Sequence, residues 1–291
     1  MNFSAITVSF PVDEETYAEL TTLCKEATQT DGACYHTVLN LPIAKSYESK
    51  GFYVLVYNDD EDKLVGAASA VDLMGLDTYE WSMLVAPMYR QLGIGDALLN
   101  VLREGMATRG ADGELAIMVE SSNYGREFLQ SRGYVYSFSE ATFEAKAEVA
   151  ALRADLVIRQ FQSKDTEALV DIFSGAFGDM REESLELIHF NTTTAGLILW
   201  VAEQAGEVVG TVTTRKEGEV QWITAFAVAP NMQGQGIGTS LLNWVKDIAL
   251  RGGEKTILLD VEVENDQALA VYEKAGFMKS SQVDYFVYIG Q

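Results

Sequence analysis

A chain of 291 residues can hold two domains of ordinary size, and its 48% hydrophobic and 22% charged residues are a balance typical of globular proteins. The formal net charge of −22, from 21 Lys and Arg against 43 Asp and Glu, argues against nucleic acid as a partner, because binding phosphates requires clustered basic side chains. The same charge favours the approach of a basic small molecule or peptide.

The cysteines, the histidines and the N-terminus exclude further classes of protein. Cys24 and Cys34 are too few to define a disulfide framework, and with only His36 and His189 no Cys/His spacing indicates a metal site. The first residues lack the basic and apolar regions of a signal peptide, and no apolar run approaches the roughly 18 residues of a membrane helix. We therefore expect a cytoplasmic protein without metal ions or membrane contact.

In the first half of the chain, alternating and helical apolar spacings predict a mixture of strands and helices. Three strands come first, and a glycine-rich turn then leads into a helix. The expected ranges are strands 53–57, 64–70 and 78–85, helix 95–107, strand 115–119, helix 124–132, and two further strands within 134–146.

The second half repeats this order after an opening strand and two helices. Gln-Ala-Gly at 204–206 suits a hairpin turn, and Gly252-Gly253 stops a helix. Because hairpins precede the glycine-rich turn, the expected fold is α/β, with a mixed, mostly antiparallel sheet and helices on both faces. The expected ranges are strand 156–159, helices 166–177 and 183–189, strands 196–203, 208–216 and 220–228, helix 238–251, strand 256–263, helix 266–275 and a closing strand 283–289.

An internal repeat links the two halves. Residues 85–95 (VAPMYRQLGIG) and 228–238 (VAPNMQGQGIG) are identical at six of eleven positions, with an offset of 143 residues. One register held over about fifty residues indicates a duplicated domain. We expect two domains, 1–150 and 151–291, with the boundary near residues 146–156, and a monomer that forms a pseudo-dimer of domains.

The glycine-rich segment 233–238 links a strand to a helix. Its glycines allow a sharp turn, so backbone amides can converge just before a helix N-terminus, a point that suits a pyrophosphate. A single Gly-x-Gly is also compatible with a plain turn. The Rossmann spacing is absent, because Ser240 and Leu241 follow Gly238, and neither half has the Gly-Lys-Ser/Thr of a P-loop.

This loop, with its Val-x-Pro strand end and its recurrence in both halves, resembles the cofactor motif of the GNAT N-acetyltransferase superfamily, Gln/Arg-x-x-Gly-x-Gly/Ala, which 233–238 and 90–95 both match. The resemblance implies a tandem member that uses acetyl-CoA, with the pyrophosphate on the loop and the pantetheine arm along the preceding strand. That strand usually carries a bulge that opens a slot and presents an N–H to the thioester carbonyl. The implied cofactor-binding residues are Phe226, Ala227, Val228, Gln233, Gly234, Gln235, Gly236, Ile237, Gly238 and Thr239 in the second copy, and Met83, Leu84, Val85, Arg90, Gln91, Leu92, Gly93, Ile94 and Gly95 in the first.

A second motif runs from Asn265 to Phe277 (NDQALAVYEKAGF). Asn265 suits the N-cap of a helix, and the resemblance implies that its side chain binds the pantetheine arm as well. Tyr272 matches the general acid of the family, the tyrosine that protonates the leaving thiolate of coenzyme A. By spacing alone, Tyr272 would be a core aromatic residue on an amphipathic helix.

The two copies differ where the chemistry is expected. The first copy has Leu129 at the position of Tyr272 and Ser122 at the position of Asn265, and Asp96 directly follows its glycine loop, where a carboxylate would repel a pyrophosphate. We therefore expect the first domain to bind cofactor weakly or to serve as a scaffold, and the second to be catalytic. Two-domain members such as mycothiol synthase are similar in this asymmetry, which concerns architecture and assigns no substrate.

The general base is not identified by the sequence. Family members often place a Glu on the strand before the loop; in an alignment on Val228, that position holds Thr224, and Trp81 in the first copy. Other carboxylates lie out of register or on the next strand, and an ordered water is a further alternative, in which case positioning would dominate catalysis. These carboxylates are Glu80, Glu219, Glu262 and Glu264.

The resemblance implies an N-acetyltransferase in which the amine of a small molecule or peptide attacks the thioester of acetyl-CoA directly. Two alternatives stay open. One is a non-catalytic acyl-CoA-binding or regulatory module, and the other is transfer of a different acyl group to a non-amine acceptor. No residue pattern identifies the acceptor.

Overall fold

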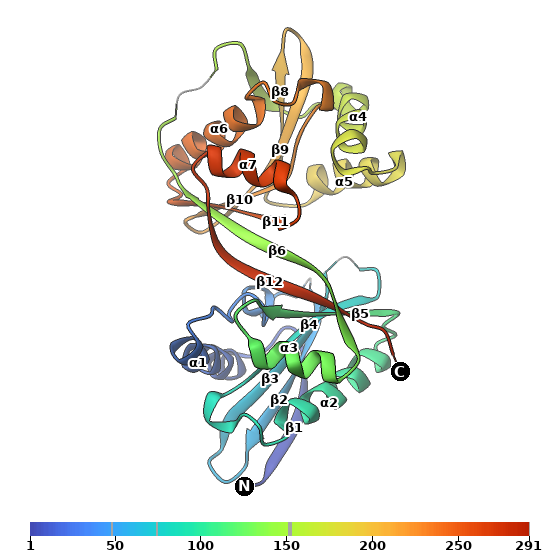
Figure 1. Ribbon diagram of the computed structural model, residues 1–291, viewed down its shortest axis with the longest axis vertical. Helices are drawn as coiled ribbons and strands as arrows, with labels where there is room; N and C mark the ends of the chain where they lie inside the picture. Colours follow the sequence, from blue (N-terminus) through green and yellow to red (C-terminus); the bar gives the residue numbers. More distant parts are fainter. Residues whose placement is uncertain (48, 74, 151–152, 291) are drawn as a thin grey trace. The chain divides into compact units, whose positions relative to one another are not determined.

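The computed structural model describes residues 1–47, 49–73, 75–150 and 153–290 (Figure 1). The chain forms two compact units: unit 1 is Met1–Ser139 with Ser281–Gln291, and unit 2 is Glu140–Ser280. Each unit contains strands of a sheet with helices packed against them.

Unit 1 opens with a strand and a helix that precede the first predicted element. Asp13 begins the helix by accepting the N–H of Thr16 at 2.8 Å, and Gly32 ends it in the left-handed conformation. The elements are β1 (Phe3–Ser9), α1 (Glu14–Asp31), β2 (Lys50–Asn58), β3 (Lys63–Asp72), β4 (Thr78–Val85), α2 (Ile94–Thr108), β5 (Gly113–Val119), α3 (Asn123–Ser131), the first part of β6 (Tyr134–Lys146) and most of β12 (Met278–Tyr288). The strand order is β1-β2-β3-β4-β5-β12, and α1 lies across the sheet from α2 (Figure 1).

Unit 2 repeats this plan. Ala205 and Gly206 form a two-residue hairpin loop in which both have positive φ, 52° and 88°, as a type I′ turn requires. The elements are the second part of β6, then β7 (Val157–Gln160), α4 (Thr166–Phe177), α5 (Arg181–Thr193), β8 (Leu197–Gln204), β9 (Glu207–Glu217), β10 (Val220–Val228), α6 (Ile237–Gly252), β11 (Thr256–Glu262) and α7 (Asp266–Lys274). The strand order is β6-β11-β10-β9-β8-β7, with α4 and α5 on one face and α6 and α7 on the other (Figure 1).

The expected α/β fold with mixed, mostly antiparallel sheets is confirmed. The strand pairs described within the units are antiparallel apart from β4–β5 and β10–β11, which are parallel. In both units the glycine loop follows the first strand of this parallel pair. A parallel pair needs a crossover connection, and α2 and α6 provide it.

Residues 134–146 form one continuous strand, so the expectation of two strands there is wrong. No Gly or Pro interrupts this range, so the strongest signals for a turn are absent from it. The second part of the strand, Glu140–Lys146, pairs antiparallel with β11 in unit 2.

The C-terminal strand was expected to close the sheet of the second copy. It pairs within unit 1 instead. Val283–Val287 of β12 lie antiparallel to Leu115–Val119 of β5. Side-chain alternation predicts which faces of a strand are buried and not which strand it pairs with. The proposed domains 1–150 and 151–291 follow the sequence repeat. The final strand of each copy, β6 or β12, instead pairs with a strand of the other copy.

A β-bulge distinguishes β10 from its counterpart β4. Thr224 pairs with Thr213 and Ala227 with Thr211, so β10 has one residue more than β9 between these pairs. Ala225, within the bulge, has a positive φ of 44°. The pairing of β4 with β3 shows no such shift, so the expected bulge is present in the second copy alone.

Candidate active site

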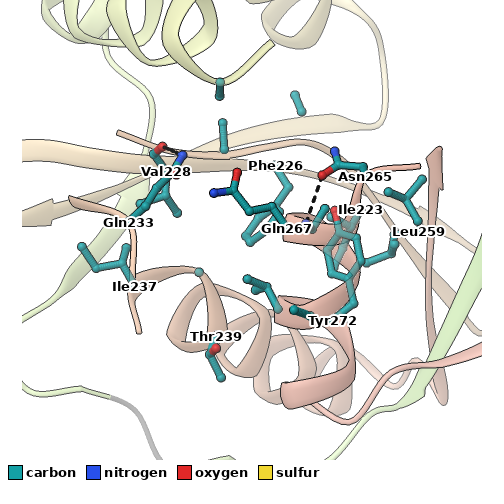
Figure 2. Close-up of a pocket in the computed structure, with 18 of the residues that line it drawn as sticks. Ile223, Phe226, Val228, Gln233, Ile237, Thr239, Leu259, Asn265, Gln267 and Tyr272 are labelled. Carbon is teal, nitrogen blue, oxygen red and sulfur yellow. Dashed lines mark hydrogen bonds between the residues drawn. The ribbon is translucent and has the colours of Figure 1, made fainter. Parts of the chain in front are cut away.

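A cavity of about 730 Å³ lies in unit 2, between the glycine loop, α7 and the split that separates β10 from β11 (Figure 2). The parallel pairing of these strands ends at Ile223 and Leu259, and the bulge of β10 follows directly. Most residues expected in the second copy's site line this cavity: Phe226, Ala227, Val228, Gln233, Gly234, Gly236, Ile237, Gly238, Thr239, Asn265 and Tyr272.

The bulge alters the backbone of β10 at the cavity wall. Ala225 and Phe226 lie between the two ladder pairs on either side of the bulge, and both residues line the cavity. A bulge disrupts the ladder locally, which leaves backbone groups available to pair with an extended ligand, as an added strand would.

The loop between β10 and α6 leaves a helix N-terminus without a side-chain cap. Gly236 occupies the N-cap position with φ 79°, and the first turn contains no acidic residue. The N–H of Ser240 bonds to the carbonyl of Gly236 at 3.1 Å, so the amides of residues 237–239 have no partner within the helix. Three such amides beside a cavity suit the oxygens of a phosphate group.

The long polar residue at the start of the motif ties the loop to the preceding strand. Gln233 Nε2 donates to the carbonyl of Val228 at 3.2 Å (Figure 2). In unit 1, Arg90 Nε donates to the carbonyl of Val85 at 3.1 Å. Gln235 does not line the cavity, and its carbonyl accepts a hydrogen bond from Arg153, which sequence reasoning had not connected with the loop.

Helix α7 carries the two residues of the second motif. Asn265 is the N-cap, as expected, and its Oδ1 accepts the N–H of Ala268 at 3.1 Å (Figure 2). Tyr272 is 6% exposed, and within the described part of the chain its hydroxyl has no hydrogen-bond partner. Its ring packs between Phe143 and Phe226, with centroids 6.1 and 5.8 Å away. Burial raises the pKa of Tyr272 to about 12, so the hydroxyl keeps its proton at neutral pH.

Carboxylates from two strands also line the cavity, and sequence reasoning found one of the three. Glu262 was a candidate base, whereas Asp260, within the apolar strand β11, and Glu140, on β6, were missed. Thr142 Oγ1 donates to Asp260 Oδ1 at 2.7 Å. The carboxylate is accessible through the cavity, yet loss of surrounding solvent raises its pKa above the ordinary value. Three other candidate bases do not line the cavity: Glu80, Glu219 and Glu264.

The bulge corrects the sequence alignment in which Thr224 of the second copy was equivalent to Trp81 of the first. Trp81 pairs with Ala116 at the end of the parallel pair in unit 1, and Ile223 pairs with Leu259 at the same point in unit 2. Trp81 therefore corresponds to Ile223. One inserted residue shifts every upstream position by one, which an alignment on the glycine loop alone misses.

The equivalent region of unit 1 encloses only about 60 Å³. Leu129, the counterpart of Tyr272, lines it and is buried, and Tyr35 and Val38 from the segment after α1 line it as well. The hydroxyl of Ser82 on β4 donates to the carbonyl of Val38 and holds this segment against the strand. Of the residues expected to bind cofactor in the first copy, Met83 lines this space, whereas eight others do not: Leu84, Val85, Arg90, Gln91, Leu92, Gly93, Ile94 and Gly95.

Asp96 is not the free anion that the sequence suggested. Arg132 on the segment after α3 donates to its carboxylate from Nε at 2.8 Å and from Nη2 at 2.6 and 2.8 Å. The pair offsets the charge that would repel a phosphate. The charge of Asp96 alone therefore gives no reason to expect that this loop repels a phosphate.

Two further features are absent from the residues that the structure describes. No group of three or more His, Cys, Asp or Glu side chains in that part of the chain is arranged to hold a metal ion. None of the helices described is long and apolar enough to span a membrane.

Structural neighbours share this architecture. A GCN5-related N-acetyltransferase from Sphaerobacter thermophilus superposes with a TM-score of 0.74 over 97% of this chain and 95% of its own, at 18% identity. A tandem GNAT protein from the clavulanic acid biosynthesis pathway superposes with a TM-score of 0.69 over 98% of both chains, at 17% identity. At these identities the likeness concerns the fold.

Sequence comparisons reach the same family. Curated relatives include the mycothiol acetyltransferase of Arthrobacter sp. (strain FB24), 24% identical over 96% of this chain and 94% of the relative, and that of Stackebrandtia nassauensis, 25% identical over 92% and 94%. The profile of the Acetyltransferase (GNAT) family matches residues 17–134 and again residues 166–277. Because these two matches cover most of the chain and both units, the protein belongs to the GNAT acetyltransferase family as a tandem, two-domain member.

Proposed function

We propose that unit 2 transfers the acetyl group of acetyl-CoA to an amine by direct attack, and that unit 1 binds no cofactor. The observation that carries this proposal is Tyr272, a residue that is 6% exposed, lines the larger cavity and has a hydroxyl without a hydrogen-bond partner among the described residues. A hydroxyl without a protein partner at a cavity wall is available to a ligand, and it could donate to a bound thiolate.

The glycine loop and β10 supply the binding energy and the electrostatics. The free amides of residues 237–239 would hold the pyrophosphate, and the backbone of β10 around Ala227 would pair with the pantetheine arm. A backbone N–H at the bulge, beside Phe226, would stabilise the negative charge that develops on the thioester carbonyl oxygen. This oxyanion-type contact is worth most in a site that excludes water.

Tyr272 would give its proton to the departing thiolate. A raised pKa keeps the hydroxyl protonated before reaction, and the desolvation that causes this raise also makes a thiolate in the same cavity more basic. The proton therefore moves between two groups that are both poorly solvated as anions. Leu129 cannot perform this step in unit 1, which supports assigning the chemistry to unit 2.

The first copy of the repeat, residues 1–150, would act as a scaffold. It contributes Glu140–Lys146, a strand segment of unit 2 that pairs directly with β11. Thr142 on this segment donates to Asp260 at the cavity. The first copy would thus support the second copy's site without binding cofactor itself.

Isothermal titration of the purified chain with acetyl-CoA tests the proposal through affinity and stoichiometry together. We expect one site per chain, followed by amine-dependent release of coenzyme A in an acceptor panel. The panel should include the acceptor of mycothiol acetyltransferases, because the relatives carry that name. Two sites per chain would contradict the role assigned to unit 1, and binding without release across the panel would favour an acyl-CoA-binding module.

A further inference from the structure

One arginine holds the glycine loop of unit 2 from outside the cavity. Arg153 lies on the segment between β6 and β7, and its Nη1 donates to the backbone carbonyl of Gln235 at 2.7 Å. Gly234 and Gly236, on either side of Gln235, line the cavity, whereas Gln235 and Arg153 do not. The arginine therefore contacts the loop at the one residue of this stretch that does not form part of the cavity wall.

A carboxylate fixes the other nitrogens of this guanidinium. Nε and Nη2 of Arg153 donate to the two oxygens of Asp155 at 2.9 and 2.6 Å, and Gln204 Nε2 donates to Oδ2 of the same carboxylate at 2.7 Å. The hydrogen bonds from Arg153 and Gln204 lower the pKa of Asp155, so it stays charged at neutral pH. Because the guanidinium is planar, this bidentate pairing also sets the direction in which Nη1 points.

The contact at the Gln235 carbonyl determines the direction of the next amide. The peptide bond between Gln235 and Gly236 is trans, so the N–H of Gly236 points away from the carbonyl that Arg153 holds. Gly236 is both a cavity residue and the N-cap of α6. By fixing the carbonyl behind the loop, Arg153 keeps this N–H in one orientation beside the cavity.

The same contact protects an amide of α6 from being used within the helix. The N–H of Thr239, a cavity residue, has the carbonyl of Gln235 four residues before it, which is the acceptor of a helical hydrogen bond. A rotation of the loop that turned this carbonyl towards the helix would pair the two groups and remove the Thr239 amide from the phosphate site. The hydrogen bond from Arg153 opposes that rotation.

The loop of unit 1 has a similar backbone and lacks this donor. Each loop has two residues at positive φ, 63° and 82° in unit 1 and 74° and 79° in unit 2. Leu92 is the counterpart of Gln235, and among the described residues no hydrogen bond reaches its carbonyl. The loop therefore forms without an arginine, and what Arg153 adds is a restraint that keeps it in one orientation.

We propose that Arg153 is a positioning residue for acetyl-CoA, which holds the loop of unit 2 with its amides directed at the pyrophosphate before the cofactor binds. The proposal rests on the cofactor site assigned to unit 2, and it gives the segment that connects the two copies a part in that site. A loop that already has its bound conformation loses less conformational freedom on binding. A fall of the competent conformation to about a tenth of the population raises the apparent Kd about tenfold.

Calorimetry of the intact chain with acetyl-CoA measures this contribution. Arg153→Ala should raise the Kd about tenfold, and Asp155→Asn, which weakens the pairing and keeps the arginine, about threefold. Arg181→Ala is the matched control, because it removes the same charge from another bidentate pair of unit 2, with Glu167, and does not line the cavity. Its Kd should equal that of the wild type. An unchanged Kd in Arg153→Ala would overturn the proposal.

A comparison of coenzyme A with 3′-dephospho-coenzyme A separates positioning from direct contact with the ribose phosphate. The second ligand keeps the pyrophosphate and lacks the phosphate on the ribose. Positioning of the loop predicts the same loss of affinity in Arg153→Ala with both ligands. A loss confined to coenzyme A would mean that Arg153 binds the ribose phosphate itself, and it would overturn the positioning role.

Backbone order in the free protein, measured by NMR relaxation, is a readout that a purely structural role would leave unchanged. In Arg153→Ala, the amide order parameters of Gln235 and Gly236 should fall from about 0.85 to below about 0.6 and recover when coenzyme A binds. The hairpin loop at Ala205 and Gly206, next to Gln204, should keep its order. Loss of order in the hairpin with an unchanged glycine loop would mean that Arg153 stabilises only the hairpin, which would overturn its role alone. Failure of the wild type to bind acetyl-CoA would overturn the function proposed for unit 2 and the role of Arg153 with it.

Discussion

Arg90 and Asp31 form a bidentate ion pair in unit 1, with Nη1 to Oδ1 at 2.9 Å and Nη2 to Oδ2 at 2.6 Å. The hydrogen bonds from Arg90 lower the pKa of Asp31, and the hydroxyl of Tyr35 also donates to this carboxylate. Arg90 is the motif counterpart of Gln233. Arg90 is the one cationic residue in the two loop motifs, and Asp31 at the end of α1 neutralises its charge within unit 1. This pairing agrees with a structural role for the first copy.

Asp31→Asn should lower the free energy of unfolding of unit 1 by about 1.5–3 kcal/mol, the usual worth of hydrogen bonds to a charged group. Urea denaturation with a probe in unit 1 measures this change. The affinity for acetyl-CoA should stay at the wild-type value, because unit 1 is not the proposed cofactor site. A weaker affinity in calorimetry would show that Arg90 and its loop take part in binding.

Tyr272→Phe should lower kcat by about 10²–10⁴-fold, the usual contribution of a positioned acid, and should leave acetyl-CoA binding unchanged. The phenyl ring keeps the packing against Phe143 and Phe226, so the loss reports the hydroxyl. Steady-state kinetics and calorimetry measure the two quantities. Tyr124→Phe, in unit 1, removes the hydroxyl of a tyrosine that is 69% exposed and should change neither. Unchanged turnover in Tyr272→Phe would remove the acid assignment.

Local sequence signals predicted the parts of the site that depend on local conformation. The glycine loop needs particular backbone conformations, and the Asn265 cap needs a short-range hydrogen bond. Both features depend only on residues that are close together in the sequence. Tyr272 also came from a local motif. The cavity itself joins these local features to Asp260 and Glu140, whose presence at its wall depends on which strands lie side by side.

Non-local features escaped the sequence for physical reasons. The exchange of β6 and β12 cannot be read from alternation, because a strand pattern specifies faces and not partners. The bulge in β10 was expected from the family resemblance, but the composition of the strand does not show where the extra residue lies, apart from the small Ala225 with its positive φ. β1 and α1 were not expected, although Asp13 and Gly32 are ordinary helix start and stop signals.

Gly236→Ala and Gly93→Ala form a matched pair for the two loops. Both glycines are helix N-caps with positive φ, 79° and 82°, and a Cβ on either would meet no atom within 4 Å. Each substitution should therefore cost about 1–2 kcal/mol of stability from backbone strain alone. Only Gly236→Ala should weaken the binding of acetyl-CoA, because its backbone strain displaces the amides that follow. Calorimetry measures this affinity. Equal weakening by both would indicate a cofactor site in each unit.

The acid stability of unit 2 should depend on Asp165. Arg159 donates to its two oxygens at 2.7 and 2.9 Å, and these hydrogen bonds lower the pKa of the buried Asp165. A carboxyl whose folded pKa lies below its unfolded value stabilises the fold above the unfolded value, about 3.9, and loses this effect as pH falls through the folded pKa.

Asp165→Asn should accordingly unfold more easily than the wild type at pH 7, by about 1.5–3 kcal/mol, and the difference should shrink below about pH 4. Urea midpoints at pH 7, 5 and 3 measure it. A difference that stays constant down to pH 3 would mean that packing, and not the charge of Asp165, carries the effect.

We expect the C-terminal strand β12 to stabilise unit 1 through the buried side chain of Asp284. This residue is 1% exposed on β12, accepts the hydroxyl of Ser139 at 2.7 Å and forms an ion pair with Arg126 on α3. Asp284→Ala should lower the stability of unit 1 by about 3 kcal/mol, since breaking a buried pair leaves its partners unsatisfied. Asp284→Asn keeps an acceptor for Ser139 and should therefore lower the stability of unit 1 by less.

Native-state hydrogen exchange distinguishes this role from a general loss of structure. Faster exchange of the β5 amides, with unchanged exchange in β8 and β9, is expected for Asp284→Ala, because β12 pairs with β5 in unit 1. Faster exchange throughout both units would instead mean that the exchanged strands make the chain unfold as one body. Unchanged exchange in β5 would show that the backbone pairing of β12 holds unit 1 together without its buried ion pair.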